Sequence, residues 1–382
     1  MKALMLASVA SMIDQFNMDN LALLKELGYD IDVVCNFETG NTSSRERVEA
    51  FQKELVEMGV RPISMPIPRK ITAWKEIIQS YQAVKKLVQD EEYDLVHCHS
   101  PIGGVITRLA CRKQRKKGTR VIYTAHGFHF YKGAPKANWM IFYPIEKYLA
   151  RDTDVLITIC QEDYQRGKQS MNAGQVVYSP GVGISVEQIR DMKENPELRR
   201  EIGVGEDALL LYSIGELNRN KNHRVIIEAL ARLKRKDVHF VVCGQGDQKE
   251  ALEQLAKELG VESQVHLLGF RTDAKAWLKT ADVFVFPSHR EGLPVSLMEA
   301  MAAGLPVVAS KIRGNVDLIQ EEKGGYLVES TDVEVFTDRI SRLLEQDQLR
   351  ENFGQWNQQA VEAFGVERVR EVMRRVYAEP QE

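Results

Sequence analysis

Cysteine, long hydrophobic runs and a strong net charge are all scarce in this sequence. Five cysteines in 382 residues, mostly within apolar runs, are typical of a reduced cytosolic protein rather than of a disulfide framework. A formal net charge of −3 gives no reason to expect nucleic acid as a partner. Charge-free stretches such as 172–186 are broken by glycine and proline, so none is expected to span a bilayer. We therefore expect a soluble, cytoplasmic protein.

Signatures of three other features are also lacking. Residues Met1–Ile13 enter Asp14 without a cleavage region, so we interpret them as a first buried strand rather than a signal peptide. The histidines and cysteines show no zinc-ligand spacing, and no D-x-D pair stands beside the candidate motifs described below. Gly244-Gln-Gly246 has no third glycine at dinucleotide spacing, which disfavours a dehydrogenase. We expect no resident cofactor and a metal-independent activity.

The order of apolar and amphipathic segments predicts the fold class. Short apolar runs, such as Lys2–Ser8 and Leu209–Ile214, alternate with helix-period segments from end to end, which is typical of parallel sheets covered by helices on both faces. The length suits two domains, and Ser179–Ser185 (SPGVGIS) is the predicted linker. We predict an α/β fold of two Rossmann-like domains, 1–182 and 183–363, facing across a cleft. A C-terminal helix within 364–382 is expected to pack back on the first domain.

Residues 289–299, HREGLPVSLME, follow the apolar run VFVFPS and form the strongest local feature. Glu291 is expected in the loop, and Glu299 along a helix whose first turn contains Pro294. The amides of Gly292 to Ser296 would then favour a phosphate at the helix N-terminus. Carboxylates at such a crevice accept hydrogen bonds from sugar hydroxyls. A solvated helix start with two surface acids is the alternative.

Two further segments join a predicted strand to the next element. In GELNRNKN (215–222), Arg219 and Lys221 precede a helix N-terminus, where a lysine would neutralise charge growing on a departing diphosphate. A solvated loop charge is the alternative for Lys221. In YTAHGFHFY (123–131), His126 lies at a strand end beside a glycine that permits close backbone approach. A structural role is the alternative for His126, and His129 is interpreted as packing.

Together these segments resemble family 4 of the retaining glycosyltransferases, which have the two-domain GT-B fold. EGLPVSLME matches the E-x7-E motif of that family, and 215–221 resembles its G-[R]-L-x-x-x-K loop. VVCGQG (241–246) resembles its second strand and turn, and LLGFR (267–271) its base-binding segment. TAHGFHFY resembles the variant in the branch that builds bacterial exopolysaccharide and capsule. The resemblance covers nearly the whole chain.

The resemblance implies transfer of a hexose or N-acetylhexosamine, with retention, from a UDP-sugar to a saccharide linked to polyprenyl diphosphate. Residues 1–182 would form the acceptor side and 183–363 the nucleotide-sugar side. Glu291 would contact hydroxyls of the donor sugar, Glu299 the ribose, and Lys221 the diphosphate. Front-face attack without a covalent enzyme intermediate is implied as well.

The remaining site residues follow from the same resemblance. His126 would approach the donor sugar from the opposite domain, and Phe270 and Arg271 would border the base. His99 and Ser100, at the end of another first-domain strand, are expected on the acceptor side. Backbone or loop positions expected in the donor site are Gly215, Arg219, Gly244, Gly292 and Leu293.

Three segments depart from the family pattern. Glu216 stands where the family usually has an arginine on the diphosphate, and Arg219 is expected to compensate. The first loop, 9–17, lacks paired glycines, which argues against close phosphate approach there. Arg313-Gly-Asn-Val-Asp317 replaces the more usual Gly-Gly-x-Pro-Glu.

Basic residues are concentrated in one part of the chain. Residues 101–150 contain ten basic side chains and one acid, Glu146. A helix over 103–117 is expected to bind the inner face of an anionic plasma membrane peripherally, with a solvated helix face as the alternative. The residues expected to contact the membrane are Arg108, Arg112, Arg115 and Lys116.

Two other functions remain open. A UDP-sugar 2-epimerase has the same general fold but would release sugar without an acceptor. A non-catalytic protein would dock on RNA or a membrane through the basic segment, bind nucleic acid in a salt-sensitive way and be indifferent to Glu291→Ala.

Overall fold

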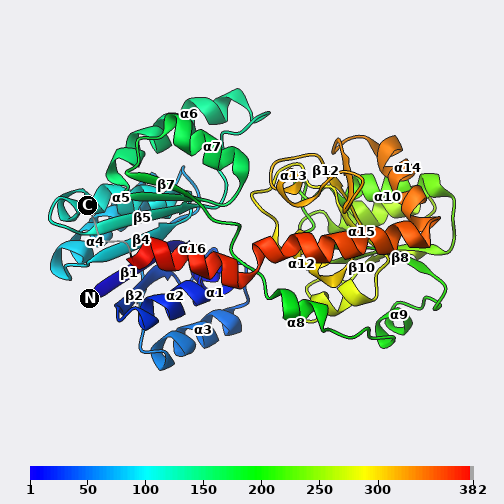
Figure 1. Cartoon of the computed structure of the whole chain (residues 1–382), viewed down its shortest axis with the longest axis horizontal. Coiled ribbons are helices and arrows are strands. Elements are labelled where there is room, and N and C mark those ends of the chain that lie inside the picture. The colour runs from blue at the N-terminus through cyan, green and yellow to red at the C-terminus, as the bar shows by residue number, and fades with distance from the viewer. Residues whose placement is uncertain (379–382) are drawn as a thin grey trace. The chain divides into compact units, whose positions relative to one another are not determined.

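The computed structural model describes residues 1–378, which divide into two compact units. Unit 1 comprises Met1–Val182 and the segment from Glu367 onward, and unit 2 comprises Gly183–Val366 (Figure 1). The chain therefore passes between the units twice. The two passing segments are paired in unit 2, because the amide of Val366 donates to the carbonyl of Ile184 at 3.0 Å. Residues 379–382 of the predicted C-terminal helix lie outside the described residues.

Unit 1 contains a parallel seven-stranded sheet in the order β3-β2-β1-β4-β5-β6-β7. Because the order reverses between β1 and β4, their carboxyl ends flank the point where such sheets bind ligands. The strands are β1 Lys2–Val9, β2 Asp30–Asn36, β3 Arg61–Ser64, β4 Leu95–His99, β5 Arg120–Ala125, β6 Val155–Thr158 and β7 Gln175–Tyr178.

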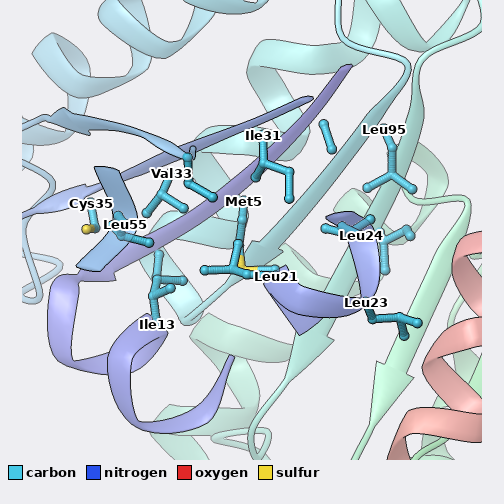
Figure 2. Close-up of a cluster of buried hydrophobic side chains, with 14 of the residues drawn as sticks. Met5, Ile13, Leu21, Leu23, Leu24, Ile31, Val33, Cys35, Leu55 and Leu95 are labelled. Carbon is cyan, nitrogen blue, oxygen red and sulfur yellow. The ribbon is translucent and has the colours of Figure 1, made fainter. Parts of the chain in front are cut away.

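Helices cover both faces of this sheet, so alternate side chains of each strand enter different cores. Met5 points into one core with Leu21, Ile31 and Val33 (Figure 2), whereas Leu4 enters the other. The first core is covered by α1 Ala10–Phe16, α2 Met18–Glu26, α3 Arg45–Glu57 and α16 Val366–Ala378. The second is covered by α4 Trp74–Asp90, α5 Pro101–Arg115, α6 Lys136–Leu149, η1 Ala150–Asp152 and α7 Gln161–Ser170.

The C-terminal helix α16 belongs to unit 1, although it follows unit 2 in the chain. Its Val369, Met373, Val376 and Tyr377 are buried in the first core. Arg374 pairs with Glu26 of α2 at 2.9 Å, and the red α16 runs beside the blue N-terminal helices in Figure 1. Helix α16 is thus held on unit 1 by apolar burial and by charge pairing.

One predicted loop proves to be helical. Residues 9–17 were expected to be irregular, but α1 occupies 10–16. Its Ala10, Ser11 and Ile13 are buried, and no side chain caps its first turn. Helix α1 starts directly at the end of β1 and has no capping side chain. Burial against the rest of the unit, rather than a local sequence signal, therefore makes these residues helical.

Unit 2 contains a parallel six-stranded sheet in the order β10-β9-β8-β11-β12-β13. Its order reverses between β8 and β11, so the loops after these two strands flank the ligand-binding point. The strands are β8 Leu209–Ile214, β9 Val238–Cys243, β10 Val265–Leu267, β11 Val283–Phe286, β12 Val307–Ser310 and β13 Gly325–Val328. Its helices are α8 Val186–Arg190, α9 Glu197–Glu201, α10 His223–Leu233, α11 Lys249–Glu258, η2 Glu262–Gln264, η3 Ala274–Lys279, α12 Val295–Ala303, α13 Asn315–Leu318, α14 Val333–Leu344, α15 Asp347–Ala360 and η4 Val361–Phe364.

The predicted α/β class with two Rossmann-like parallel sheets is confirmed. The five cysteines are buried. Within residues 1–378, no helix combines the length and the apolar character needed to cross a membrane.

Candidate functional site

In unit 2, two glycine turns bring the ends of β8 and β9 into backbone contact. A Cβ on Gly244 would lie 1.8 Å from the carbonyl oxygen of Gly215, and one on Gly246 would lie 2.3 Å from that of Leu217. The amide of Leu217 donates to the carbonyl of Gln245 at 3.0 Å. Only glycine permits this approach, so the glycine pair, which does not form a dinucleotide motif, positions the loop that carries Lys221.

The loop after β8 is also joined to the loop after β11. The amide of His289 donates to the carbonyl of Asn220 at 2.8 Å, and the Asn220 side chain donates to the carbonyl of Arg290 at 2.9 Å. Asn222 adopts a left-handed φ of 55° and donates to the carbonyls of Pro287 and Ser330. These asparagines hold the two predicted motifs together.

This junction brings Lys221 and Glu291 together. The Nζ of Lys221 lies 2.8 Å from Oε1 of Glu291, and 19% and 15% of the two side chains are exposed. The ammonium also lies 4.8 Å from the centre of the Phe286 ring. A half-buried ammonium that donates once to a carboxylate retains two further N–H groups for an anionic ligand.

The helix after Glu291 starts one residue later than predicted. Pro294 is the residue before α12, with φ −77° and ψ 120°, rather than a member of its first turn. The first amides of α12 have no partners within the helix and no acid lies in its first turn, so this end favours an anion. Leu293, by contrast, is buried as part of the core.

The departing segment Arg313–Asp317 supports this loop. Gly314 has a φ of 80°, and a Cβ there would lie 2.0 Å from the carbonyl oxygen of Gly292. Arg313 donates through Nε to the carbonyl of Glu291 at 3.1 Å. The segment therefore supports the backbone of the Glu291 loop despite its difference from the family pattern.

Glu299 lies on the second turn of α12 and is 7% exposed. Its Oε1 is 2.8 Å from Nζ of Lys275, which lies in η3. The sequence analysis missed Lys275, because its segment has no motif and only the fold of η3 brings it to α12. The pairing fixes the orientation of a nearly buried carboxylate.

The other predicted donor residues lie outside these two ion pairs. Phe270 is 70% exposed, whereas Arg271 is bound to Glu201 and also pairs with Asp273 at 2.6 Å. Glu216 is exposed and accepts from the Asn218 side chain at 2.8 Å. Arg219 is exposed at the edge of the same loop, so its guanidinium is accessible to solvent.

In unit 1, the end of β4 and the segment after β5 bring histidines together. Nδ1 of His99 lies 3.1 Å from Nε2 of His126, and the rings of His97 and His99 are 4.1 Å apart. His97 bonds to Thr124 and to Tyr377 of α16, each at 2.8 Å. The predicted residues His99 and His126 are thus in direct contact, and the C-terminal helix supports them through His97.

Burial keeps these imidazoles neutral. It lowers the pKa of His126 to about 4 and that of His97 to about 3. The pKa of His99 lies well below its ordinary range, first because of burial and then because of electrostatic coupling to His97 and His126. The cluster can therefore donate and accept hydrogen bonds at neutral pH, but it cannot supply positive charge.

Ser100 connects this cluster to α5 through a strained backbone. It has φ 61° and ψ 151°, a region almost confined to glycine. Its hydroxyl accepts from the amide of Ser8 at 2.9 Å and lies 2.9 Å from the Ser8 hydroxyl. The ends of β1 and β4 are therefore bonded together where the strand order reverses.

The predicted membrane residues of α5 are mostly engaged within the unit. Arg108 is 1% exposed, lies 2.8 Å from Glu146 and has its guanidinium 4.0 Å from the centre of the Tyr123 ring. Its predicted membrane contact is wrong, because Glu146 of α6 binds it inside the unit. Arg112 pairs with Asp152 and Arg115 with Asp154, each at 2.7 Å. Lys116 is exposed.

A cavity of about 580 Å³ lies beside α3 in unit 1. Phe37, Asn41, Gln52 and Ser64 are among its lining residues, and the predicted His99 and Ser100 are not. Within residues 1–378, no three His, Cys, Asp or Glu residues form a group that could hold a metal ion.

Two family models match the chain, one for each half. Residues 6–160 match the model described as glycosyl transferase 4-like. Residues 194–360 match the model described as glycosyl transferases group 1. These matches contain the histidine cluster and both ion-paired carboxylates.

Two relatives resemble most of the chain. One, from Bacillus subtilis (strain 168), is named EpsD and assigned as a glycosyltransferase; it is 36% identical over 382 residues, 99% of this chain and 96% of the relative. The other is the UDP-Gal:alpha-D-GlcNAc-diphosphoundecaprenol alpha-1,3-galactosyltransferase of Escherichia coli. It is 27% identical over 347 residues, 88% of this chain and 86% of the relative.

Solved structures share the fold at lower identity. Anabaena Alr3699/HepE in complex with UDP has a TM-score of 0.76 and 19% identity, and the match covers 99% of this chain and 100% of that chain. Sucrose-phosphate synthase from Thermosynechococcus elongatus has a TM-score of 0.77 and 18% identity, covering 99% and 98%.

Proposed function

Because this chain belongs to family 4 of the glycosyltransferases, we propose that it transfers a hexose or N-acetylhexosamine, with retention, from a UDP-sugar to a saccharide linked to polyprenyl diphosphate. The ion pair of Lys221 and Glu291, 2.8 Å apart where the strand order of unit 2 reverses, carries this proposal. The name of the Escherichia coli relative, which includes both UDP-Gal and a diphosphoundecaprenol acceptor, supports it.

The donor diphosphate binds between Lys221 and the first turn of α12 in this proposal. One N–H of the Lys221 ammonium remains on Glu291, and the other two bind phosphate oxygens. The positive end of α12, with the amides near Gly292 and Leu293, stabilises the negative charge that grows on the departing diphosphate. These groups supply the charge stabilisation that the leaving group needs, so we propose that the reaction requires no metal ion.

Glu291 and Glu299 bind different hydroxyl groups of the donor. Lys221 orients Glu291, which accepts from hydroxyls of the sugar, and Lys275 orients Glu299, which accepts from the ribose. A carboxylate held by one lysine has a lone pair left for a hydroxyl donor. Phe270 offers its exposed ring to the base, while Arg271, held by Glu201 and Asp273, borders it.

The histidine cluster of unit 1 serves the sugar and the acceptor. His126 bonds to the donor sugar as a neutral imidazole, since burial lowers its pKa to about 4. His99 and Ser100 lie on the acceptor side. We assign the activity to cytoplasmic synthesis of exopolysaccharide or capsule, in keeping with the 36% identity to EpsD.

The test joins nucleotide binding to product analysis. Thermal unfolding of the full chain is followed with UDP, GDP, ADP and NAD, for wild type, Glu299→Ala and the exposed control Glu334→Ala. A ligand at 100 times its dissociation constant should stabilise the fold by about 2.7 kcal/mol. We expect this shift with UDP alone, in wild type and control but not in Glu299→Ala.

Product analysis separates the remaining alternatives. Labelled UDP-hexoses and UDP-N-acetylhexosamines are incubated with a lipid-linked saccharide, with and without a chelator of divalent cations. Label should pass to the lipid in both conditions and only when acceptor is present. Release of an epimerised sugar without acceptor would instead establish a 2-epimerase, and stabilisation by NAD alone would exclude a UDP-sugar donor.

A further inference from the structure

We propose that the exposed face of α6 docks unit 1 on an anionic lipid surface. Four large side chains of this helix are exposed: Met140 by 76%, Ile141 by 45%, Ile145 by 41% and Tyr148 by 53%. Ile141, Ile145 and Tyr148 are spaced by four and three residues, so they form one stripe along the helix. Such a concentration of exposed apolar side chains marks an interaction surface.

The exposed charged residues in this stretch of the chain have one sign. Every exposed charged residue between 131 and 151 is basic, and the only acid in α6, Glu146, faces inward to Arg108 at 2.8 Å. An apolar stripe with basic flanks is complementary to anionic headgroups above acyl chains. A second copy of this face would bring like charges together, which disfavours self-association. The basic residues are Lys132, Lys136, Lys147 and Arg151.

The opposite side of α6 fixes the helix to the unit. Trp139, Phe142 and Tyr143 pack against the second core, and Tyr143 meets Phe130 edge-on with ring centres 5.3 Å apart. Internal packing therefore accounts for these aromatic side chains, while the exposed stripe has no part in the core. In Figure 1, α6 lies at the periphery of unit 1.

Tyr148 lies at the cationic end of the stripe. The guanidinium of Arg112 is 5.0 Å from its ring centre and that of Arg151 is 6.0 Å away. A tyrosine between cations suits the boundary between headgroups and acyl chains, where its ring is buried and its hydroxyl hydrated. Of the basic residues expected on α5, Arg112 thus contacts the end of this stripe, while it also pairs with Asp152 at 2.7 Å.

Vesicle binding tests the proposal. The full chain is sedimented with vesicles of phosphatidylcholine alone or of phosphatidylcholine and phosphatidylglycerol in equal parts, at low and high salt. Lys136→Glu/Lys147→Glu should weaken partition to anionic vesicles by at least about 25-fold, since each basic residue contributes about fivefold. Ile141→Ser/Ile145→Ser should weaken it by roughly tenfold or more per residue.

The matched control is Lys53→Glu/Val56→Ser on the exposed side of α3, which should bind as wild type does. Trp74→Ser/Ile78→Ser tests the other exposed apolar cluster of unit 1. Unchanged thermal unfolding would show that each variant folds.

Three results would overturn the proposal. The first is no binding of wild type to anionic vesicles at low salt. The second is binding of both α6 variants to anionic vesicles as strongly as wild type, or loss of binding only in the α4 variant Trp74→Ser/Ile78→Ser. The third is a change in oligomeric mass by light scattering in the α6 variants without vesicle binding, which would assign the face to protein association.

Discussion

The two units have parallel sheets whose strand order reverses in the middle, yet they place opposite chemistry at that point. In unit 2, Lys221 and Glu291 form an ion pair of 2.8 Å, and Lys275 and Glu299 form a second pair at the same distance. In unit 1, the corresponding strand ends carry histidines that burial keeps neutral, with the pKa of His126 at about 4.

In the proposed function, this difference separates two tasks of a glycosyl transfer. Charge that grows on a diphosphate needs fixed cations and helix amides, and the unit 2 site offers both. A sugar needs directional hydrogen bonds, which neutral imidazoles supply without the cost of a buried charge. The same topology thus presents either kind of group, because the loops beyond the strands determine the chemistry.

Removing the unit 2 cation should produce the largest effect. Lys221→Ala should lower kcat about thousandfold, equivalent to about 4 kcal/mol, because the leaving diphosphate loses its ammonium and Glu291 loses its partner. Initial rates and calorimetric binding of UDP measure both consequences. Lys323→Ala, an exposed lysine in the same unit, is the control. A decrease in kcat of less than tenfold would mean that the helix amides alone stabilise the charge on the leaving diphosphate.

Disturbing the glycine turns should destabilise the same site by a smaller amount. Gly244→Ala places a Cβ 1.8 Å from the Gly215 carbonyl oxygen, so the backbone must move and unfolding should become easier by about 3 kcal/mol. Chemical denaturation measures the change. At Gly205 a Cβ meets nothing within 4 Å, so Gly205→Ala should stay within about 0.5 kcal/mol of wild type. Equal losses of stability in Gly244→Ala and Gly205→Ala would show that the close contact between Gly244 and Gly215 does not contribute to stability.

Acid should affect unit 1 through His97. Burial lowers the pKa of His97 from 6.5 to about 3. As the pH falls, His97 therefore binds a proton at a higher pH in the unfolded chain than in the native chain. This contribution to stability is complete above about pH 6.5 and is lost as the pH falls toward 3. At pH 4.5, wild type should have lost about 3 kcal/mol of stability through this residue.

A variant isolates that loss. His97→Gln should be less stable than wild type at pH 7, and the difference in unfolding free energy should narrow by about 3 kcal/mol at pH 4.5. The exposed His289→Gln is the control substitution. A constant gap for His97→Gln would mean that His97 is protonated in the native state.

The sequence predicts the fold and the local motifs far better than their partners. The buried strand Leu209–Ile214 begins and ends where the sequence predicts, because a short continuous apolar run is typical of a strand buried on both faces. Lys275 was missed and Arg108 was wrongly placed on the surface, because their partners Glu299 and Glu146 lie on other elements. Such pairs depend on three-dimensional packing, and no local spacing encodes them.

The smallest predicted effect concerns Arg219, which is expected to replace the arginine that the family usually has at the position of Glu216. Arg219 is exposed on the loop that carries Lys221, so binding a phosphate would cost it side-chain order and water, and an exposed pair contributes only about 1 kcal/mol. Arg219→Ala should therefore weaken UDP binding about fivefold and leave kcat nearly unchanged. Glu216→Arg, which restores the usual family residue, should recover that affinity in the Arg219→Ala background. Calorimetry at two salt concentrations measures the UDP affinity of both variants. Unchanged affinity in Arg219→Ala would mean that Lys221 and α12 bind the diphosphate without Arg219.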